Sequence, residues 1–175
     1  MSERYTEKAQ RIIFFARYEA AQVGASYIEP EHLLLGLLRE SRELITPPAD
    51  LHNLVDELRT AMPAPGKKIS TSVDLPLSHG TKRILAYSAE EAKRLSHQQI
   101  TPEHLLLGLM RESGTPAAEI LRKHDFTAVR VKIGLRGGNE AIVHALRETF
   151  SPMASRLTGE IEPAVTFSFK PGEGA

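Results

Sequence analysis

The chain has 175 residues, of which 41% are hydrophobic and 25% charged, as in an ordinary globular protein. Its 22 lysines and arginines balance its 22 aspartates and glutamates, so there is no basic field to attract nucleic acid. The absence of cysteine excludes disulfides, thiolate metal ligands and cysteine nucleophiles. No apolar stretch reaches the ~20 residues of a membrane span, and no signal-peptide core follows Met1. We therefore expect a cytoplasmic protein without nucleic-acid or membrane partners.

The first sixty residues predict three helices. The first begins after Thr6, whose hydroxyl suits an N-cap, and stops near Gly24. The second has Pro30 at its first position, and its leucines cover more than half the circumference, so we expect it to be central and buried. A further helix follows at residues 51–62. Between the last two, Pro47 and Pro48 argue against a regular helix.

A segment of the chain recurs at a fixed offset of 72 residues, from Pro30 to Pro102. Residues 30–41 (PEHLLLGLLRES) return at residues 102–113 as PEHLLLGLMRES, with a single difference. Chance does not produce this match, so the two halves are copies of one structural unit. Gly36 and Gly108, at the centre of the repeated segment, each cost ~1 kcal/mol of helix propensity against alanine. Close approach by another helix would explain why both copies keep glycine.

The second copy is predicted to contain about four helices, of which the first two match those of the first copy, with Ser78 as the N-cap of the first. A short helix should then start at Pro116, and another should run from Thr127 to about Leu135.

We expect one domain over residues 1–136, with an extension over residues 137–175. The domain divides into repeats at about 4–62 and 76–136, joined by a linker at 63–75. The extension is predicted to hold a helix at about 139–157 and an extended tail, because residues 164–169 alternate like a strand.

The tail must pair with something if it is a strand, since its backbone groups need hydrogen-bond partners. One candidate is residues 69–75, which also alternate and are predicted to be extended. The other candidates are a second copy of the chain in a homodimer, and a partner protein to which the tail adds a strand. A disordered terminus is the remaining interpretation.

The paired PEHLLLGL segments resemble the amino-terminal domain of Clp unfoldases of the ClpA and ClpC type. The segment Thr6-Glu7-Lys8-Ala9 also fits that family, and the resemblance covers roughly residues 4–136. It implies an all-α fold in which two pseudo-twofold-related four-helix repeats pack as one domain. In that family the domain precedes ATPase modules and receives substrates and adaptor proteins. No G-x-x-x-x-G-K-[ST] motif occurs here, so the resemblance implies a stand-alone, non-catalytic protein-binding module without cofactor.

The expected partners are therefore Clp ATPase or protease subunits, adaptors or client polypeptides. An adaptor or a substrate receptor is the leading interpretation, and a structural accessory subunit of a Clp protease ring is the runner-up. A small hydrolase using His and Glu is the alternative of another class, opposed by the missing nucleophile constellation and metal-ligand spacing. An open cleft shared by Glu31 and His32 would favour that hydrolase.

Five residues are candidates for protein or peptide binding, and two of them are glutamates. By resemblance to ClpC-type domains, Glu31 and Glu103 would contribute to recognising phosphorylated arginine, because a carboxylate can take a bidentate pair from a guanidinium group. The family often has Thr before that Glu. Pro30 and Pro102 replace it here and remove both a hydroxyl and a backbone donor for phosphate. The alternative is that both glutamates are helix-start charges favoured by the helix dipole.

The other three candidates are Phe14, Phe15 and Tyr18, which exceed what one core face needs. They form either core against the other repeat or an exposed patch that receives clients.

His32 and His104 are interpreted as structural histidines that hydrogen-bond within the fold, not as metal ligands or general bases. We interpret Arg39-Glu40 and Arg111-Glu112 as solvated ends of the central helices, with pairing across the repeat interface as the alternative.

Overall fold

The computed structural model describes residues 2–44 and 51–124, which form six α-helices and two short 3-10 helices without any strand. The first repeat contributes η1 (Ser2–Arg4), α1 (Glu7–Gln22), α2 (Pro30–Glu40), η2 (Arg42–Leu44) and α3 (Leu51–Ala61). The second contributes α4 (His79–Arg94), α5 (Pro102–Arg111) and α6 (Pro116–Lys123). The all-α prediction is confirmed. The predicted helices at 127–135 and 139–157, the tail and the Pro47-Pro48 segment lie outside the described residues.

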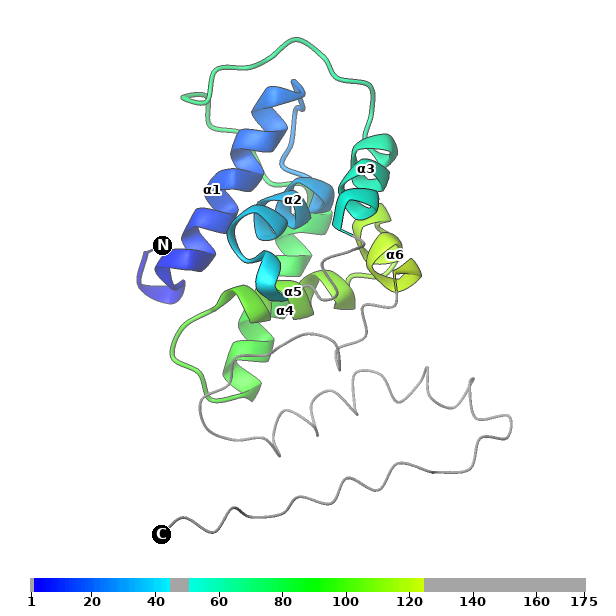
Figure 1. Cartoon of the computed structure of the whole chain (residues 1–175). Helices are drawn as coiled ribbons and strands as arrows, with labels where there is room; N and C mark the ends of the chain where they lie inside the picture. Colours follow the sequence, from blue (N-terminus) through cyan, green and yellow to red (C-terminus); the bar gives the residue numbers. More distant parts are fainter. Residues whose placement is uncertain (1, 45–50, 125–175) are drawn as a thin grey trace, which may run out of the picture.

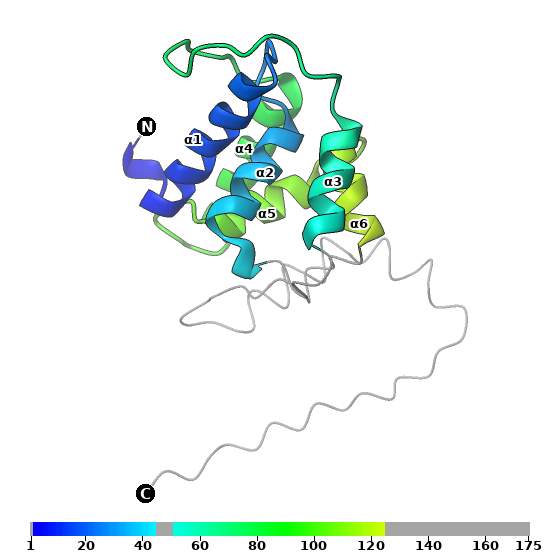
Figure 2. The same ribbon diagram turned by 45° about the horizontal axis from the view of Figure 1, so that its top comes forward.

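The two repeats share one arrangement of their first two helices. In each, the long first helix packs along the leucine-rich second one, α1 against α2 and α4 against α5 (Figures 1 and 2). Helix α3 lies beside α6 in both views, so the first repeat also contacts the last described helix of the second. No helix in the described part of the chain is long and apolar enough to cross a membrane.

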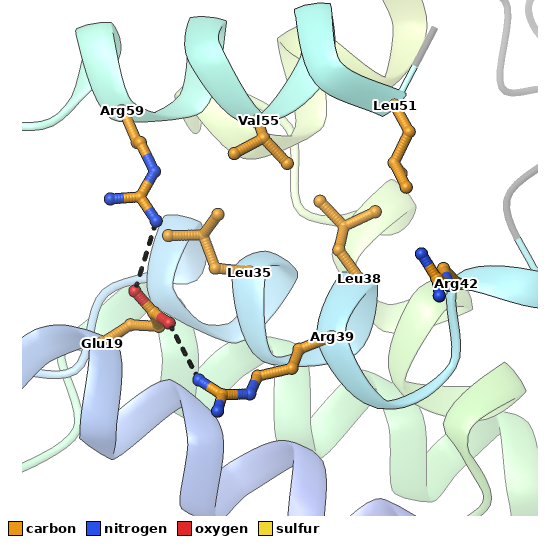
Figure 3. Close-up of a pocket in the computed structure, with 8 residues that line it drawn as sticks. All are labelled: Glu19, Leu35, Leu38, Arg39, Arg42, Leu51, Val55 and Arg59. Atoms are coloured by element: carbon orange, nitrogen blue, oxygen red, sulfur yellow. Dashed lines mark ion pairs between the residues drawn. The ribbon is translucent and has the colours of Figure 1, made fainter. Parts of the chain in front are cut away.

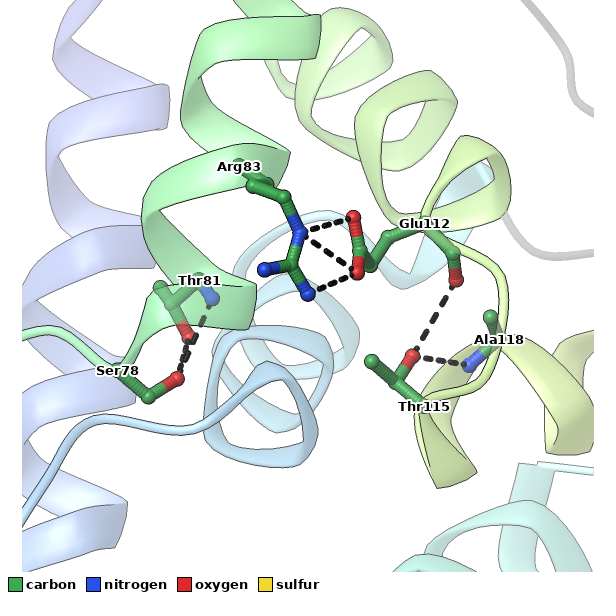
Figure 4. A network of polar contacts seen from close by, with 6 residues as sticks. All are labelled: Ser78, Thr81, Arg83, Glu112, Thr115 and Ala118. Carbon is green, nitrogen blue, oxygen red and sulfur yellow. Dashed lines mark hydrogen bonds and ion pairs between the residues drawn. The ribbon is translucent and has the colours of Figure 1, made fainter.

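Three helices begin at a hydroxyl that accepts a hydrogen bond from the helix backbone. Thr6, Ser78 and Thr115 each accept a hydrogen bond at 3.3 Å from the backbone N–H three residues further on. This satisfies one of the N–H groups that a helix start leaves unpaired, and it confirms the predicted N-caps of α1 and α4. Figure 4 shows the caps made by Ser78 and Thr115. Helix α1 ends just before Gly24, whose φ of +68° turns the chain away from the helix. The second repeat places Ser96 at the equivalent position with a φ of +57°.

Two short backbone bridges join the repeats. Tyr5 pairs with Ile100 and Ile28 pairs with Leu77, both in parallel orientation, through four backbone hydrogen bonds of 2.7, 3.0, 2.8 and 3.1 Å. Adding the repeat offset of 72 to Tyr5 and Ile28 gives Leu77 and Ile100, so the two bridges exchange under the pseudo-twofold axis. Each repeat therefore supplies one strand-like residue to each bridge, which holds the two copies together as one unit.

Gly36 and Gly108 lie where the first two helices of each repeat touch. A Cβ atom on Gly36 would collide with the carbonyl oxygen of Ile12 in α1. A Cβ atom on Gly108 would collide with the Ser88 hydroxyl and the Ile84 carbonyl oxygen in α4. The prediction that close helix approach explains both glycines is confirmed.

The core is built mainly from the leucines of α2 and α5, which confirms that these helices are central. The largest side chains with under 2% exposure are Ile12, Leu33, Leu34, Leu37, Leu54, Leu58, Ile84, Leu105, Leu106, Leu109 and Leu121.

The segment 69–75 is not the extended strand that its alternation predicted. The Ile69 N–H donates to the carbonyl oxygen of Ala21 at 3.0 Å, and the chain then turns so that the Val73 N–H donates to Ser70 at 3.0 Å. The Ser70 hydroxyl also accepts from the Ser72 N–H at 3.3 Å. Serine side chains that bond their own backbone favour such turns over strands.

Candidate functional site

A groove of about 330 Å³ lies between α2 and α3 of the first repeat (Figure 3). Its lining has an apolar part and a charged rim, made of Leu35, Leu38, Leu51 and Val55, and of Glu19, Arg39, Arg42 and Arg59 respectively. Ligand pockets start at roughly this volume, so the groove suits a short segment and not a folded domain.

Helical spacing explains why these side chains meet. Leu51, Val55 and Arg59 follow one another at four-residue intervals and so share one face of α3. Leu54 and Leu58 occupy the neighbouring face and are fully buried in the core. Helix α3 therefore carries two apolar stripes, of which one anchors it and the other lines the groove.

The rim is positively charged on balance, with three arginines and one glutamate. Glu19 lies between Arg39 and Arg59, and the closest nitrogen–oxygen distances are 3.6 and 3.9 Å (Figure 3). These pairs are longer than the 2.7–2.9 Å typical of charge-assisted hydrogen bonds. The side chains of Arg39 and Arg59 remain 50% and 57% exposed, so solvent reaches both.

An aromatic cluster adjoins the groove through Arg39. The Arg39 guanidinium lies 4.4 Å from the ring centroid of Phe15 and 5.3 Å from that of Tyr18, both half-buried on α1. Phe14 packs edge-to-face on Phe15 with 5.7 Å between centroids and is 60% exposed. The structure thus places these aromatics toward the surface of α1 beside the groove, and Phe14 does not belong to the core.

The described residues of the second repeat, which end at 124, do not reproduce the positive rim. Arg111, the equivalent of Arg39, lies 4.5 Å from the Tyr87 ring centroid, but it pairs with Glu90 at 2.8 Å and Glu91 at 3.2 Å. Glu90 occupies the position of Tyr18 and so adds a second carboxylate. Gly114 stands at the position of Arg42, so the exposed cations of the groove belong to the first repeat.

Glu31 does not line the groove. It is 6% exposed, and its Oε1 accepts a hydrogen bond from the backbone N–H of Ala117 at 3.1 Å, at the start of α6. Burial raises the pKa of Glu31, partly opposed by the backbone hydrogen bonds it accepts. Glu103 is half-buried and also lies outside the groove lining. Recognition of phosphorylated arginine by these glutamates stays a prediction, and Glu31 would have to leave Ala117 to take part.

The two motif histidines hydrogen-bond within the fold, which confirms their structural interpretation. Nδ1 of His32 accepts from the Glu29 N–H at 3.0 Å, and Nδ1 of His104 accepts from the Thr101 N–H at 2.9 Å. Burial, and secondarily the neighbouring His97, lowers the pKa of His104 to about 4. Burial also lowers the pKa of His32, which is only 2% exposed.

Glu31 and His32 are both buried, so they do not form the open cleft that would favour a hydrolase. The described residues also contain no group of three or more side chains able to hold a metal ion.

The prediction of solvated helix ends is wrong for Glu112, which is 4% exposed. Arg83 of the same repeat binds it through Nε, at 3.0 and 3.1 Å from the two carboxylate oxygens (Figure 4). Arg11 and Glu40 form the equivalent pair in the first repeat at 2.6 Å. The sequence signal for these pairs was the common 29-residue spacing within both repeats.

Comparison with known proteins identifies relatives over most of the chain. The family model described as "Clp repeat (R) N-terminal domain" matches residues 4–124. A ClpA homolog of Guillardia theta is 33% identical over 184 residues, covering 94% of this chain and 22% of that protein. The chloroplastic chaperone protein ClpC2 of Oryza sativa subsp. japonica is 37% identical over 187 residues, covering 94% and 20%. The chain thus spans about a fifth of the length of these relatives.

Solved structures show the same fold. The N-terminal domain of the caseinolytic protease associated chaperone ClpD from Arabidopsis thaliana superposes with a TM-score of 0.54 at 27% identity, covering 90% of this chain and 96% of that one. The Hsp104 N-terminal domain from Candida albicans has a TM-score of 0.54 at 18% identity, covering 83% and 91%. At that lower identity, the likeness concerns the fold alone.

Proposed function

The chain belongs to the Clp repeat N-terminal domain family, and we propose that it is a non-catalytic protein-binding module that serves Clp-type unfoldases or proteases. Its partners would be client polypeptides, adaptors or the ring subunits themselves. Family membership supports a receptor or adaptor role, because the relatives carry this domain within Clp ATPases and chaperones. The expected cytoplasmic location stays a prediction, since ClpC2 is a chloroplastic protein.

The groove between α2 and α3 is the observation that carries the proposal. Leu51 and Val55 of α3 are partly exposed there beside the buried Leu35 and Leu38 of α2, and the neighbouring face of α3 is fixed in the core. Exposed apolar surface rimmed by polar residues is typical of a protein-binding site. Phe14, with Phe15 and Tyr18 behind it, extends this surface along α1 and gives the kind of aromatic contact that interfaces favour.

An affinity capture with the whole chain as bait, read by mass spectrometry, tests this function. A Val55→Asp variant places a carboxylate in the apolar lining and within the positive rim, so it should block binding. Asn53→Asp, on the exposed outer face of the same helix, is the matched control. Wild type and the control should recover Clp ring subunits, adaptors or clients, and Val55→Asp should lose them.

The alternative role as an accessory subunit gives a different pattern. Ring subunits recovered equally by wild type and Val55→Asp would show docking through another surface and would favour that role. Nothing above background with any of the three baits would contradict the protein-binding function as a whole.

A further inference from the structure

We infer that the groove between α2 and α3 selects partner segments in which aliphatic residues are flanked by carboxylates. This specificity rests on the proposed protein-binding function and names the chemistry of its partner. The occupant is an acidic, leucine-rich stretch of another protein, which places its aliphatic side chains on the apolar lining and its carboxylates on the arginine rim.

Charge complementarity carries this inference. The whole chain has a formal net charge of zero, so the excess of arginine around the groove is a local feature. Glu19 is the single carboxylate in the lining, and it lies 3.6 Å from Arg39 and 3.9 Å from Arg59. One carboxylate at these distances leaves most guanidinium donors available to a second acceptor.

Two arginines outside the groove form shorter ion pairs with carboxylates than Arg39 and Arg59 do. Arg11 approaches Glu40 to 2.6 Å, and Arg83 meets both carboxylate oxygens of Glu112. These shorter pairs hold neighbouring helices together. The groove arginines lack such tight partners among the groove-lining residues, although they stand beside an apolar surface where a charge-assisted hydrogen bond is strong.

Arg39 is also held in position before any ligand arrives. Its guanidinium carbon lies 4.4 Å from the ring centroid of Phe15 and 5.3 Å from that of Tyr18, so the two rings restrict where the group can move. A planar group held in this way loses less side-chain entropy when it takes a carboxylate. Together with Arg42 and Arg59 on the two flanking elements, it surrounds the apolar lining with donors (Figure 3).

The second repeat serves as an internal comparison. Its stacked Arg111 is neutralised by Glu90 and Glu91, and Gly114 replaces Arg42. Lys123 stands at the position of Leu51 and pairs with Glu57 at 3.0 Å. Acidic–aliphatic segments should therefore bind one repeat of the two.

Fluorescence anisotropy with three labelled peptides on the whole chain tests the inference. The peptides share a leucine pattern and differ in the interleaved residue, which is Glu, Gln or Lys. The Glu–Leu peptide should bind at least about tenfold more tightly than the Gln–Leu peptide, with Lys–Leu weakest, because each charge-assisted hydrogen bond to the rim adds to affinity. Raising the salt concentration should narrow this difference.

Two groove variants and one control complete the experiment. Arg42→Gln/Arg59→Gln should reduce Glu–Leu binding most of the way to the Gln–Leu level, because only Arg39 remains, and Arg42→Glu/Arg59→Glu should reverse the order of Glu–Leu and Lys–Leu. Lys82→Gln/Lys93→Gln removes the same charge from exposed positions on α4 and should leave the order unchanged. Thermal unfolding of each variant checks that its fold is intact.

The outcomes separate this inference from the proposed function. Equal affinity for the three peptides, or a Glu–Leu preference that survives the arginine variants, would overturn the acidic specificity while partner capture stays sensitive to Val55→Asp. Failure of the proposed function would instead appear as an empty capture experiment, whatever the peptides do.

Discussion

The carboxylate of Glu31, in the first turn of α2, accepts a hydrogen bond from the backbone N–H of Ala117 in the first turn of α6, 86 residues away. The contact ties the start of a first-repeat helix to the start of a second-repeat helix. Both ends carry partial positive charge, and one buried carboxylate lies between them. By the repeat offset, Glu103 would face residue 45, which lies outside the described residues.

Two substitutions of Glu31 should separate its role as a hydrogen-bond acceptor from the effect of its charge. Glu31→Ala leaves the Ala117 N–H without its partner and should lower the free energy of unfolding by about 1–3 kcal/mol. Glu31→Gln keeps an acceptor oxygen and removes a buried charge, so it should change stability by less than about 1 kcal/mol. Urea denaturation of both variants measures the difference, with half-buried Glu103→Ala as the comparison. Equal losses for the Gln and Ala variants would contradict the capping role.

The difference in stability between wild type and Glu31→Gln should depend on pH, because the pKa of Glu31 is raised. A carboxyl group with a raised pKa binds a proton in the folded chain at pH values where the unfolded chain has already lost it. Wild-type stability relative to Glu31→Gln should therefore fall as the pH rises from the ordinary value of 4.5 toward neutrality. A stability difference that stays constant over this range would show that the folded carboxyl titrates normally.

His104 should have the opposite effect on the pH dependence of stability, because it should make the fold less stable as the pH falls. Its folded pKa of about 4 lies below the ordinary 6.5, so between these values the unfolded chain binds more protons. The stability associated with neutral His104 is present above pH 6.5 and is lost as the pH falls toward 4. The loss is at most about 3 kcal/mol before solvent screening reduces it.

An NMR titration of the histidine Cε1 protons checks this pKa directly. The Thr101 N–H can only donate, so Nδ1 of His104 is an acceptor and the ring proton is on Nε2, which faces Nδ1 of His97 at 2.9 Å. His97→Ala should raise the midpoint of His104 only in part, because burial is the larger cause. A wild-type midpoint near 6.5 would rule out the shift.

Gly36→Ala should destabilise the fold although alanine is the better helix former. A gain of ~1 kcal/mol in helix propensity is outweighed by collision of the new methyl group with the α1 backbone, and overpacking of this kind typically costs about 1–3 kcal/mol. Gly108→Ala should behave alike against α4. Gly80→Ala is the control, because its Cβ would meet only side-chain atoms, the ring of Pro30 at 3.2 Å and the Thr115 methyl at 3.8 Å. Thermal unfolding should lower the midpoint for the first two variants and hardly change it for the third.

The repeated motif predicted much of the fold because it combines helical spacing with local signals. Pro30, Pro102 and the hydroxyl caps act within one turn of their own position, so their consequences follow from the sequence. The glycines act through contact with another helix, and their recurrence in both copies is what indicated it. The groove depends on how α3 crosses α2, which is set by packing between segments far apart in the chain. Likewise, no local pattern indicates that Glu31 meets Ala117, or that the alternating residues 69–75 turn instead of extending.

The last prediction concerns Phe14 of the aromatic cluster, whose substitution should weaken binding without changing stability. Phe14 is 60% exposed, so Phe14→Ser removes little buried area and should leave the unfolding midpoint nearly unchanged. Phe14 packs on Phe15, which in turn lies against Arg39 at the groove rim. Its loss should therefore weaken binding of the captured partner several-fold. Tyr27, an aromatic residue that is 51% exposed and outside the groove lining, provides the matched variant Tyr27→Ser. Equal affinity for both variants, measured by anisotropy with the captured partner, would place the partner away from α1.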